Sequence, residues 1–399
     1  MKKHSFINKL FGVFIACFIA VPGLYAAVTF KTKPYLQHLQ AEEVTIMWMT
    51  EGVGHGWVEW GSSSSSLGNK SQQNDRGLIQ AYTDINRITI EGLTPNTTYY
   101  YRVRSREITA TANTSATFGS TITSATYSFK TPPANENNVT MLVMNDARND
   151  ATIIGHFAQH AKTPPYDLVF FNGDMLSAVP NKAAVMNNLI IPAADQFATS
   201  IPFYTVRGEN ELKNRYAQNY LSCFYPGEKN KGYYSFSRGP VFFIALDSGN
   251  NEDDDMSSYS QLSASGKYRK EQAAWLKEQL QSEQRASASY TVVLMHLPTH
   301  SSTETEEYGV AACREAFSSL FNDYGIDLLI SGHTCKAGVL PANGSRSYPI
   351  VTGGGYGKST TKTDTNAACV ILTADLSQLK ITLLDYSGTE TAGPVVSAN

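Results

Sequence analysis

Apolar and polar positions alternate along the first third of the chain. Val44, Ile46 and Trp48 fall on one face of their segment, and alternation of this kind predicts β-strands with one buried face. A second strand is predicted at 57–60. The serine run at 62–66 that follows it predicts a flexible hairpin tip.

The segment 93–103 indicates the kind of β-domain. A turn that contains Pro95 precedes a strand in which Tyr99, Tyr101 and Val103 share one face. A turn followed by an inward tyrosine is the tyrosine-corner arrangement of fibronectin-like sandwiches. Because aromatic alternation usually reflects core packing, we expect this face to be buried; an aromatic surface that binds sugar or protein is the alternative.

From residue 139 onward, short continuous apolar runs alternate with longer helical stretches. Such runs predict strands that are buried on both faces, and Trp275, Leu276 and Leu280 on one side of 271–280 predict a helix. Alternating strands and helices indicate an α/β layer domain. Strands are predicted at 139–144, 167–171, 202–206, 241–246, 290–295, 326–330, 368–372 and 379–384.

The N-terminus has the layout of a secretory signal peptide. Lys2, Lys3 and Lys9 accompany an apolar run at 10–21. The run is shorter than the ~20 residues that a spanning helix needs, which disfavours a membrane anchor, and a lipoprotein attached at Cys17 is disfavoured by the apolar residues after it. We therefore expect an exported protein, periplasmic or secreted, with no transmembrane segment once the signal is removed.

Two prolines followed by Asn and Glu residues give 132–138 the composition of a linker. The predicted organisation is a signal peptide at 1–26, a β-sandwich at 27–131, the linker at 132–138 and an α/β domain at 139–399.

Composition narrows the possible partners. Charged residues make up 17% of the 399 residues and the net charge is -3, so neither a nucleic acid polymer nor an anionic membrane is indicated. The oligomeric state is not indicated either. Without the signal peptide an even number of cysteines remains, which permits disulfides, although the spacing selects no pair and forms no CxxC motif. They are Cys223, Cys313, Cys335 and Cys369.

Polar residues of a few types follow five of the predicted strands. In open α/β sheets, ligands bind beyond the carboxyl ends of the strands, so these residues are expected to converge. Carboxylates and imidazoles suit Zn, Fe, Mn or related ions. Each residue alone is explained as a helix cap or a structural histidine, but five together favour a metal site. They are Asp146, Asp174, Glu209, His296 and His333.

The chain resembles purple acid phosphatases and their calcineurin-like metallophosphoesterase relatives. The resemblance implies a fibronectin-III-like sandwich followed by a four-layer αββα sandwich. It also implies hydrolysis of small phosphorylated substrates by two metal ions that activate a water. The segments that carry it are 33–37, 45–48, 93–103, 173–174, 208–211, 233–236, 243–247, 293–296, 332–333 and 351–355.

The resemblance assigns one ion site with little change. Asp174 matches the aspartate that bridges the two ions. With Glu209, His296 and His333 it would hold the second ion, and Glu209 replaces an asparagine of the family pattern. The substitution keeps an oxygen ligand and adds a negative charge.

The first ion site departs from the family pattern. Asp146 is retained, but Ser177 replaces the tyrosine ligand, and Cys335 replaces a histidine. Cys335 is either a thiolate ligand or a buried small residue or disulfide partner. Arg148 replaces a glycine, and its fixed charge is able to stand in for the first ion and contact phosphate. The expected metal content is therefore one or two ions, and one if Arg148 takes this role.

A further departure concerns proton transfer. Asn210 occupies the position of the histidine that assists the leaving group, and an amide cannot supply a proton. His300, four residues after His296, is a substitute; Glu304, Glu306 and Glu307 are weaker ones, because such runs are usually solvated loops.

Three functions follow from these departures. The first is a metal-dependent phosphomonoesterase, similar to acid phosphatases, with an altered site and reduced activity. The second is a catalytically degenerate protein that binds phosphate or metal on the same fold. The third is a phosphodiesterase or nucleotide hydrolase.

Overall fold

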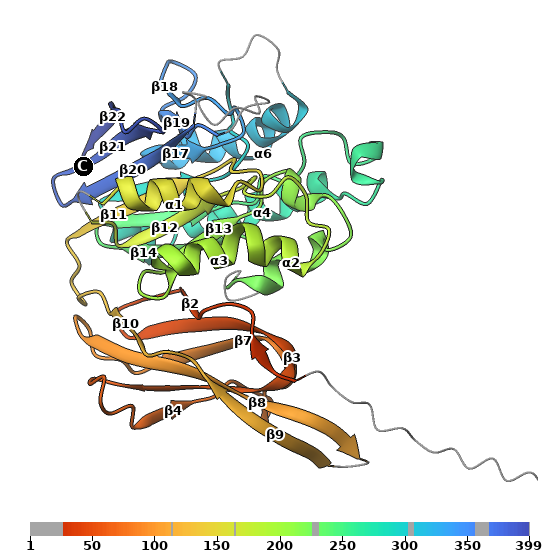
Figure 1. Ribbon diagram of the computed structural model, residues 1–399. Coiled ribbons are helices and arrows are strands. Elements are labelled where there is room, and N and C mark those ends of the chain that lie inside the picture. Colours follow the sequence, from red (N-terminus) through yellow and green to blue (C-terminus); the bar gives the residue numbers. More distant parts are fainter. Residues whose placement is uncertain are drawn as a thin grey trace, which may run out of the picture.

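The computed structural model describes residues 27–112, 115–162, 165–225, 231–301, 307–355 and 367–398. An N-terminal β-rich domain lies against a larger α/β domain (Figure 1). The predicted signal peptide at 1–26 lies outside the described residues. Among the helices in the ranges above, none has the length and apolar character needed to cross a bilayer.

The N-terminal domain is organised around one long strand, β3 (Glu43–Gly61). Its first half pairs with β2 (Tyr35–Gln37) and β7 (Ala81–Glu91), and its second half pairs with β4 (Asn69–Ser71) and β8 (Thr98–Ala112). The other strands are β1 (Thr29–Phe30), β5 (Asn74–Asp75), β6 (Leu78–Ile79), β9 (Ser115–Thr123) and β10 (Tyr127–Lys130).

The prediction of a separate strand at 57–60 is wrong, because these residues continue β3. The register between β3 and β7 shifts between Met49 and His55. Such an irregularity bends a strand without ending it, so one strand takes part in both halves of the domain. The serine run lies in the hairpin between β3 and β4.

Large apolar side chains fill the interior of the N-terminal domain. Trp48, Tyr99, Tyr101 and Val103 are all buried in one cluster. The backbone N–H of Thr94 donates a 2.9 Å hydrogen bond to the Tyr99 hydroxyl, which is the bond that defines a tyrosine corner. The alternating aromatic face is therefore core, as expected, and not a binding surface.

The α/β domain contains two six-stranded sheets. The first has the order β13-β12-β11-β20-β21-β22, and the second has the order β14-β15-β16-β17-β19-β18. Their facing sides share one apolar core. The strands are β11 (Asn138–Met144), β12 (Leu168–Asn172), β13 (Phe203–Val206), β14 (Tyr234–Arg238), β15 (Val241–Ala245), β16 (Tyr290–Leu294), β17 (Leu328–Ser331), β18 (Gly338–Leu340), β19 (Ile350–Thr352), β20 (Ala368–Asp375), β21 (Gln378–Asp385) and β22 (Glu390–Ser397).

Helices cover the outer face of each sheet (Figure 1). This gives the four-layer αββα arrangement that the resemblance implied. The helix predicted at 271–280 forms the later part of α4, and the eight predicted strands correspond to observed ones. The helices are α1 (Ala151–His160), α2 (Lys182–Val185), α3 (Ile191–Ala193), α4 (Ser265–Leu280), α5 (Glu283–Ala286) and α6 (Tyr308–Tyr324). Shorter 3-10 or π turns lie at Met186–Ile190, Ala194–Ala198, Asn210–Leu212, Ala217–Cys223 and Ser257–Tyr259.

The four cysteines among the described residues form no disulfide. Cys223, Cys313, Cys335 and Cys369 are free thiols, and all but Cys335 are buried. The disulfide interpretation of Cys335 is therefore wrong, while its other two interpretations depend on the site described next.

Candidate metal centre

The site lies where strands of the two sheets end side by side. Asp146 and Asp174 follow the parallel strands β11 and β12, and His296 and His333 follow the parallel strands β16 and β17. Asn172 connects the two sheets at this edge. Its side-chain amide donates to the carbonyl oxygens that precede the two histidine segments, at 3.4 Å and 3.1 Å.

Three buried side chains form the compact part of the site. Ligand atoms of Asp146, Asp174 and His296 all lie within 4.8 Å of one another. Nδ1 of His296 lies 2.9 Å from the Asn172 carbonyl oxygen, to which it donates. This fixes Nε2 as the free nitrogen, and Nε2 is buried without a hydrogen-bond partner, 3.4 Å from Asp174 Oδ2. An oriented, unpartnered imidazole nitrogen among carboxylates fits a metal ligand.

The charges around this triad favour a cation. Burial alone would lower the pKa of His296, but the carboxylates of Asp174 and Asp146 raise it to about 10. Burial likewise opposes ionisation of Asp174, yet the charge of His296 keeps its pKa below the ordinary value. Positive charge is therefore stabilised next to these two carboxylates.

Glu209 and His333 extend the triad on one side. His333 Nδ1 lies 3.9 Å from Glu209 Oε2 and has no hydrogen-bond partner, and the His333 ring centre is 5.6 Å from that of His296. On its other side, His333 Nε2 is 2.7 Å from a carboxylate oxygen of Glu307. Burial, followed by the charge of Asp174, raises the pKa of Glu209. The five strand-end residues therefore gather in one place.

Arg148 lies against the other side of the triad. Its Nη2 is 3.5 Å from Asp146 Oδ1 and 3.6 Å from Asp174 Oδ2. Cys335 Sγ lies 3.6 Å from the same oxygen of Asp146, and burial together with Asp146 raises the pKa of this thiol to about 12. Ser177 is exposed and donates to the Arg148 carbonyl, so it does not reach the triad in this arrangement.

Several site residues have a backbone conformation that side chains rarely adopt. The φ angle is 53° at Asp146, 52° at Asp174 and 67° at His333, with 45° at Arg148 and 52° at Cys335. Left-handed backbone is strained at non-glycine residues and concentrates at functional sites. The same five positions were selected from the sequence for their chemistry, so two independent features mark the site.

Glycines bring the ligand-bearing loops into close contact. A Cβ atom added to Gly208 would lie 2.2 Å from Asp174 Oδ1, and one added to Gly173 would lie 2.7 Å from the Cβ atom of His296. Any larger residue at these two positions would push the strand ends apart.

Comparison with known families covers both domains. The purple acid phosphatase N-terminal domain family matches residues 32–131, and the calcineurin-like phosphoesterase family matches residues 141–337. The chain belongs to the calcineurin-like phosphoesterases of the purple acid phosphatase kind.

Relatives agree with this assignment at low sequence identity. Probable purple acid phosphatase 20 of Arabidopsis thaliana is 23% identical over 76% of this chain and 68% of its own length. Purple acid phosphatase 23 of the same plant is 23% identical over 64% of this chain and 58% of its own length.

Solved structures show the same fold. The purple acid phosphatase PPD1 from yellow lupin (Lupinus luteus) seeds has a TM-score of 0.65 and 17% identity, covering 91% of this chain and 74% of that one. PhoD has a TM-score of 0.60 and 14% identity, covering 93% of this chain and 90% of that one.

The two predicted proton-transfer residues have different surroundings. Asn210 contacts the triad, because its side-chain amide donates to Asp174 Oδ2 and its backbone N–H donates to Asp174 Oδ1 at 2.9 Å. Nδ1 of His300 lies 3.1 Å from Thr299 Oγ1, a contact that connects it to its neighbour and not to the triad. Glu304 and Glu306 lie outside the described residues.

Contacts of three residues that support the candidate site were not predicted from the sequence. Asn145 donates to Asp146 Oδ2 at 2.8 Å. Glu307, considered above only as a weaker candidate for proton transfer, contacts His333. Glu211 is fully buried, and burial raises its pKa to about 7. It accepts the backbone N–H groups of Asp174, Leu176 and Gly208 at 2.8, 2.8 and 2.7 Å. The sequence feature that could have identified Glu211 is its position in 208–211, one of the segments that carry the family resemblance.

Proposed function

We propose that the protein hydrolyses phosphoesters of small molecules with the help of a bound metal ion. The observation that carries this proposal is the buried, unpartnered Nε2 of His296, which faces Asp146 and Asp174. Its family membership supports the same reaction class, since the calcineurin-like phosphoesterase family matches residues 141–337, a range that contains all three triad residues.

One ion is proposed for the side of the triad next to His333. Asp174, Glu209, His296 and His333 supply two carboxylates and two imidazoles, a donor set suited to Zn, Fe or Mn. Both histidines have a free ring nitrogen there. When bound, such an ion supplies positive charge for the phosphate and lowers the pKa of a coordinated water.

Arg148 is proposed to replace the other ion. Its guanidinium lies near one oxygen of each carboxylate, Asp146 and Asp174. A guanidinium carries a permanent charge and presents several N–H donors to phosphate oxygens. In this arrangement Cys335 is a neutral neighbour of Asp146 and not a ligand. The proposed content is therefore about one metal ion per chain.

The proposed activity is reduced and depends on the leaving group. Asn210 donates hydrogen bonds at the position where the family pattern has a histidine, but it has no proton to transfer. Loss of a general acid typically costs ~10²–10⁴ in rate. Substrates whose leaving groups are acidic need no proton, so aryl phosphates should react faster than alkyl phosphates. His300 remains the proposed substitute donor.

A degenerate binding protein is the second proposal. The contacts of Arg148 with Asp146 and Asp174 favour it, since they satisfy the two carboxylates partly without any ion. In that case the site binds metal or phosphate and turns nothing over.

Elemental analysis combined with an aryl phosphate assay tests both proposals, on the wild type and on Asn210→His. We expect about one metal per chain, faster aryl than alkyl hydrolysis, and a gain in alkyl hydrolysis in Asn210→His of roughly ten-fold or more. Two tightly bound ions would contradict the role of Arg148. No turnover by either protein with Zn, Mn or Fe would leave only the binding function.

We also propose that the protein is exported after cleavage of residues 1–26. The domain boundaries proposed from the sequence are 27–131 and 139–399, with a linker at 132–138; β10 ends before this linker, and β11 begins at its last residue, Asn138. Sequencing the N-terminus of the mature protein tests the cleavage; a retained Met1 would contradict it.

A further inference from the structure

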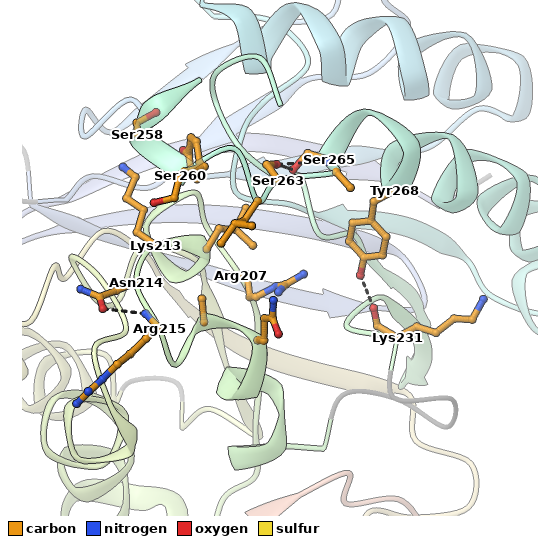
Figure 2. Close-up of a pocket in the computed structure, with 16 residues that line it drawn as sticks. Arg207, Lys213, Asn214, Arg215, Lys231, Ser258, Ser260, Ser263, Ser265 and Tyr268 are labelled. Atoms are coloured by element: carbon orange, nitrogen blue, oxygen red, sulfur yellow. Dashed lines mark hydrogen bonds between the residues drawn. The ribbon is translucent and has the colours of Figure 1, made fainter. Parts of the chain in front are cut away.

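A large cavity opens beside the metal centre. Its volume is about 1010 Å³, which is the size of a pocket for an organic ligand. Its walls come from the segment that follows Asn210, from the loop before α4, and from Tyr268 of α4 (Figure 2). The cavity shares none of its lining residues with the triad.

Two lining residues nevertheless connect the cavity to the metal centre. Lys213 Nζ donates a 2.8 Å hydrogen bond to the side-chain oxygen of Asn210, which itself contacts Asp174. On the opposite wall, the Tyr259 hydroxyl accepts from the backbone N–H of Asn251 at 3.5 Å. The Asn251 side chain lies 3.4 Å from His333 Nε2. The inner end of the cavity is therefore bounded by neighbours of the metal centre.

The charge of the lining has one sign. Arg207, Lys213, Arg215 and Lys231 line the cavity, and none of the lining residues that the structure describes is a carboxylate. Two of these cations are neutralised by carboxylates that are not among the lining residues. Arg207 forms an ion pair with Asp247 at 2.6 Å, and Lys231 forms one with Glu271 at 2.9 Å.

The other two cations are not neutralised in this way. Within the ranges that the structure describes, neither Lys213 nor Arg215 lies at ion-pair distance from a carboxylate. The Arg215 side chain extends away from the centre of the cavity, whereas Lys213 extends toward Ser258 and Ser260 (Figure 2). Lys213 is thus the cation that is available to a ligand and nearest to the reacting centre.

The remaining lining suits a hydroxylated or cyclic group. In the segment before α4, the hydroxyls of Ser258, Ser260 and Ser263 alternate with the side chains of Tyr259 and Leu262. The Lys213 ammonium lies 5.4 Å from the centre of the Tyr259 ring. The cavity therefore offers hydrogen bonds, an apolar face and the positive charge of Lys213, which forms no ion pair within the described part of the chain.

We propose that this cavity binds the part of the substrate that is not transferred, and that Lys213 selects phosphomonoesters in which this part carries a second anionic group. The inference rests on the proposed hydrolase function, because it assumes that the phosphate binds at the metal centre. Whatever is attached to that phosphate must extend away from the buried triad, and this cavity adjoins it.

A pair of substrates that differ by one charge tests the proposal. The pair is 4-carboxyphenyl phosphate and its neutral 4-carbamoyl analogue. For the wild type we expect kcat/KM to be roughly three- to five-fold higher for the charged member at low salt, and the preference to shrink as salt screens the charge. Lys213→Met should abolish the preference, and Lys213→Arg should retain it. Lys231→Met is the matched control and should leave it unchanged.

A binding experiment separates failure of this inference from failure of the hydrolase proposal. Calorimetry with the uncleavable pair 4-carboxybenzylphosphonate and 4-carbamoylbenzylphosphonate measures the same preference without turnover. Equal affinities in the wild type, or a preference that survives in Lys213→Met, would overturn the role of Lys213, whether or not the protein hydrolyses phosphoesters. A preference for the charged phosphonate that Lys213→Met removes would support it even if no substrate is turned over.

Discussion

At the scale of single residues, the hydrogen bond between Glu307 and His333 has a testable consequence. Glu307 holds the Nε2–H of His333, which leaves Nδ1 free to face Glu209. Outer carboxylates of this kind orient a ligand and raise its basicity, and their loss typically weakens metal binding by ~10–100-fold. We expect Glu307→Gln to weaken metal binding roughly ten-fold, as measured by calorimetric metal titration.

The matched control is Glu315→Gln, which removes the same charge from an exposed position on α6. It should leave the affinity unchanged. Equal metal affinities for Glu307→Gln and the wild type would show that His333 needs no such support, or that it is not a ligand.

The position of Arg148 makes a second prediction at the same scale. If its guanidinium takes the place of an ion between Asp146 and Asp174, removing it and restoring a nitrogen ligand should reopen that place. We expect the double variant Arg148→Gly, Cys335→His to bind about two ions per chain where the wild type binds one, as measured by elemental analysis after gel filtration. Arg215→Gly, which removes an exposed arginine outside the triad, should not change the count. A count of one in the double variant would contradict the substitution of ion by arginine.

Site residues could be predicted from the sequence where a residue type that binds metal directly follows a predicted strand. Asp146, Asp174 and His296 follow buried apolar strands, so their convergence could be expected from the sheet alone. Glu307 could not be found in this way, since it precedes helix α6 instead of ending a strand, and its contact with His333 exists only in the folded chain. The same holds for the three backbone bonds of Glu211, which exist only after two loops have met.

At the scale of elements, the same pair of hydrogen bonds between an aspartate and a threonine joins two parallel strands in each sheet. We call this pair of bonds the clamp. In the first sheet, Asp167 accepts the backbone N–H of Thr140 at 2.7 Å and donates its own N–H to the Thr140 carbonyl. In the second sheet, Asp327 and Thr291 repeat both bonds, with 2.7 Å for the carboxylate contact. The clamp fixes the register of β11 with β12 and of β16 with β17 at the ends opposite to the site.

Asp327 is half-buried, which allows a prediction about pH. Burial raises its pKa above the ordinary value of 3.8. A carboxyl group whose pKa is raised in the folded state contributes most to stability below its unfolded pKa, and this contribution falls as pH rises through the folded pKa. Asp327→Asn keeps the acceptor oxygen without the charge, so we expect it to be at least as stable as the wild type at neutral pH. As pH rises above 3.8, the free energy of unfolding should therefore decrease less in Asp327→Asn than in the wild type.

Asp327→Ala removes the acceptor and leaves the Thr291 N–H unpaired, which should cost about 1–3 kcal/mol. Urea unfolding at several pH values measures all three proteins. An Asp327→Asn variant that is less stable than the wild type at neutral pH would show that the charge itself is needed.

Strands and helices were largely predictable from periodicity, because apolar runs of strand length identify buried strands in a layered domain. The exception is β3, which the sequence suggested as two strands. Hydrophobic alternation is interrupted between Met49 and His55, and periodicity cannot distinguish the end of a strand from a bulge inside it.

At the scale of the whole molecule, the two domains share a polar and apolar interface. Tyr35, Met47 and Met49 of the N-terminal domain belong to the same buried cluster as the helices that cover the first sheet. The linker is also fixed, since Glu136 pairs with Arg238 at 3.0 Å. The sequence indicated two domains and a linker, but not this contact, which joins residues more than a hundred positions apart.

Gln37 makes this interface testable. Its side chain is buried, donates to the Phe203 carbonyl at 2.7 Å and accepts from the Tyr225 N–H at 3.1 Å, while the Tyr35 hydroxyl donates to the Cys223 carbonyl at 2.7 Å. Gln37→Leu keeps the approximate volume but leaves a buried donor and acceptor unpaired, so we expect it to lower the free energy of unfolding by about 2 kcal/mol.

Because the interface couples the domains, this loss should appear in both. Three of the four tryptophans lie in the N-terminal domain, at 48, 57 and 60, so their fluorescence reports mainly on that domain, whereas metal binding reports on the α/β domain. We expect the two signals to change at the same urea concentration in the wild type, and at the same lower concentration in Gln37→Leu. Gln284→Leu, an equivalent change at an exposed position of α5, should move neither. Separate transitions for the two signals would show that the domains unfold independently and that the β-domain does not stabilise the metal centre.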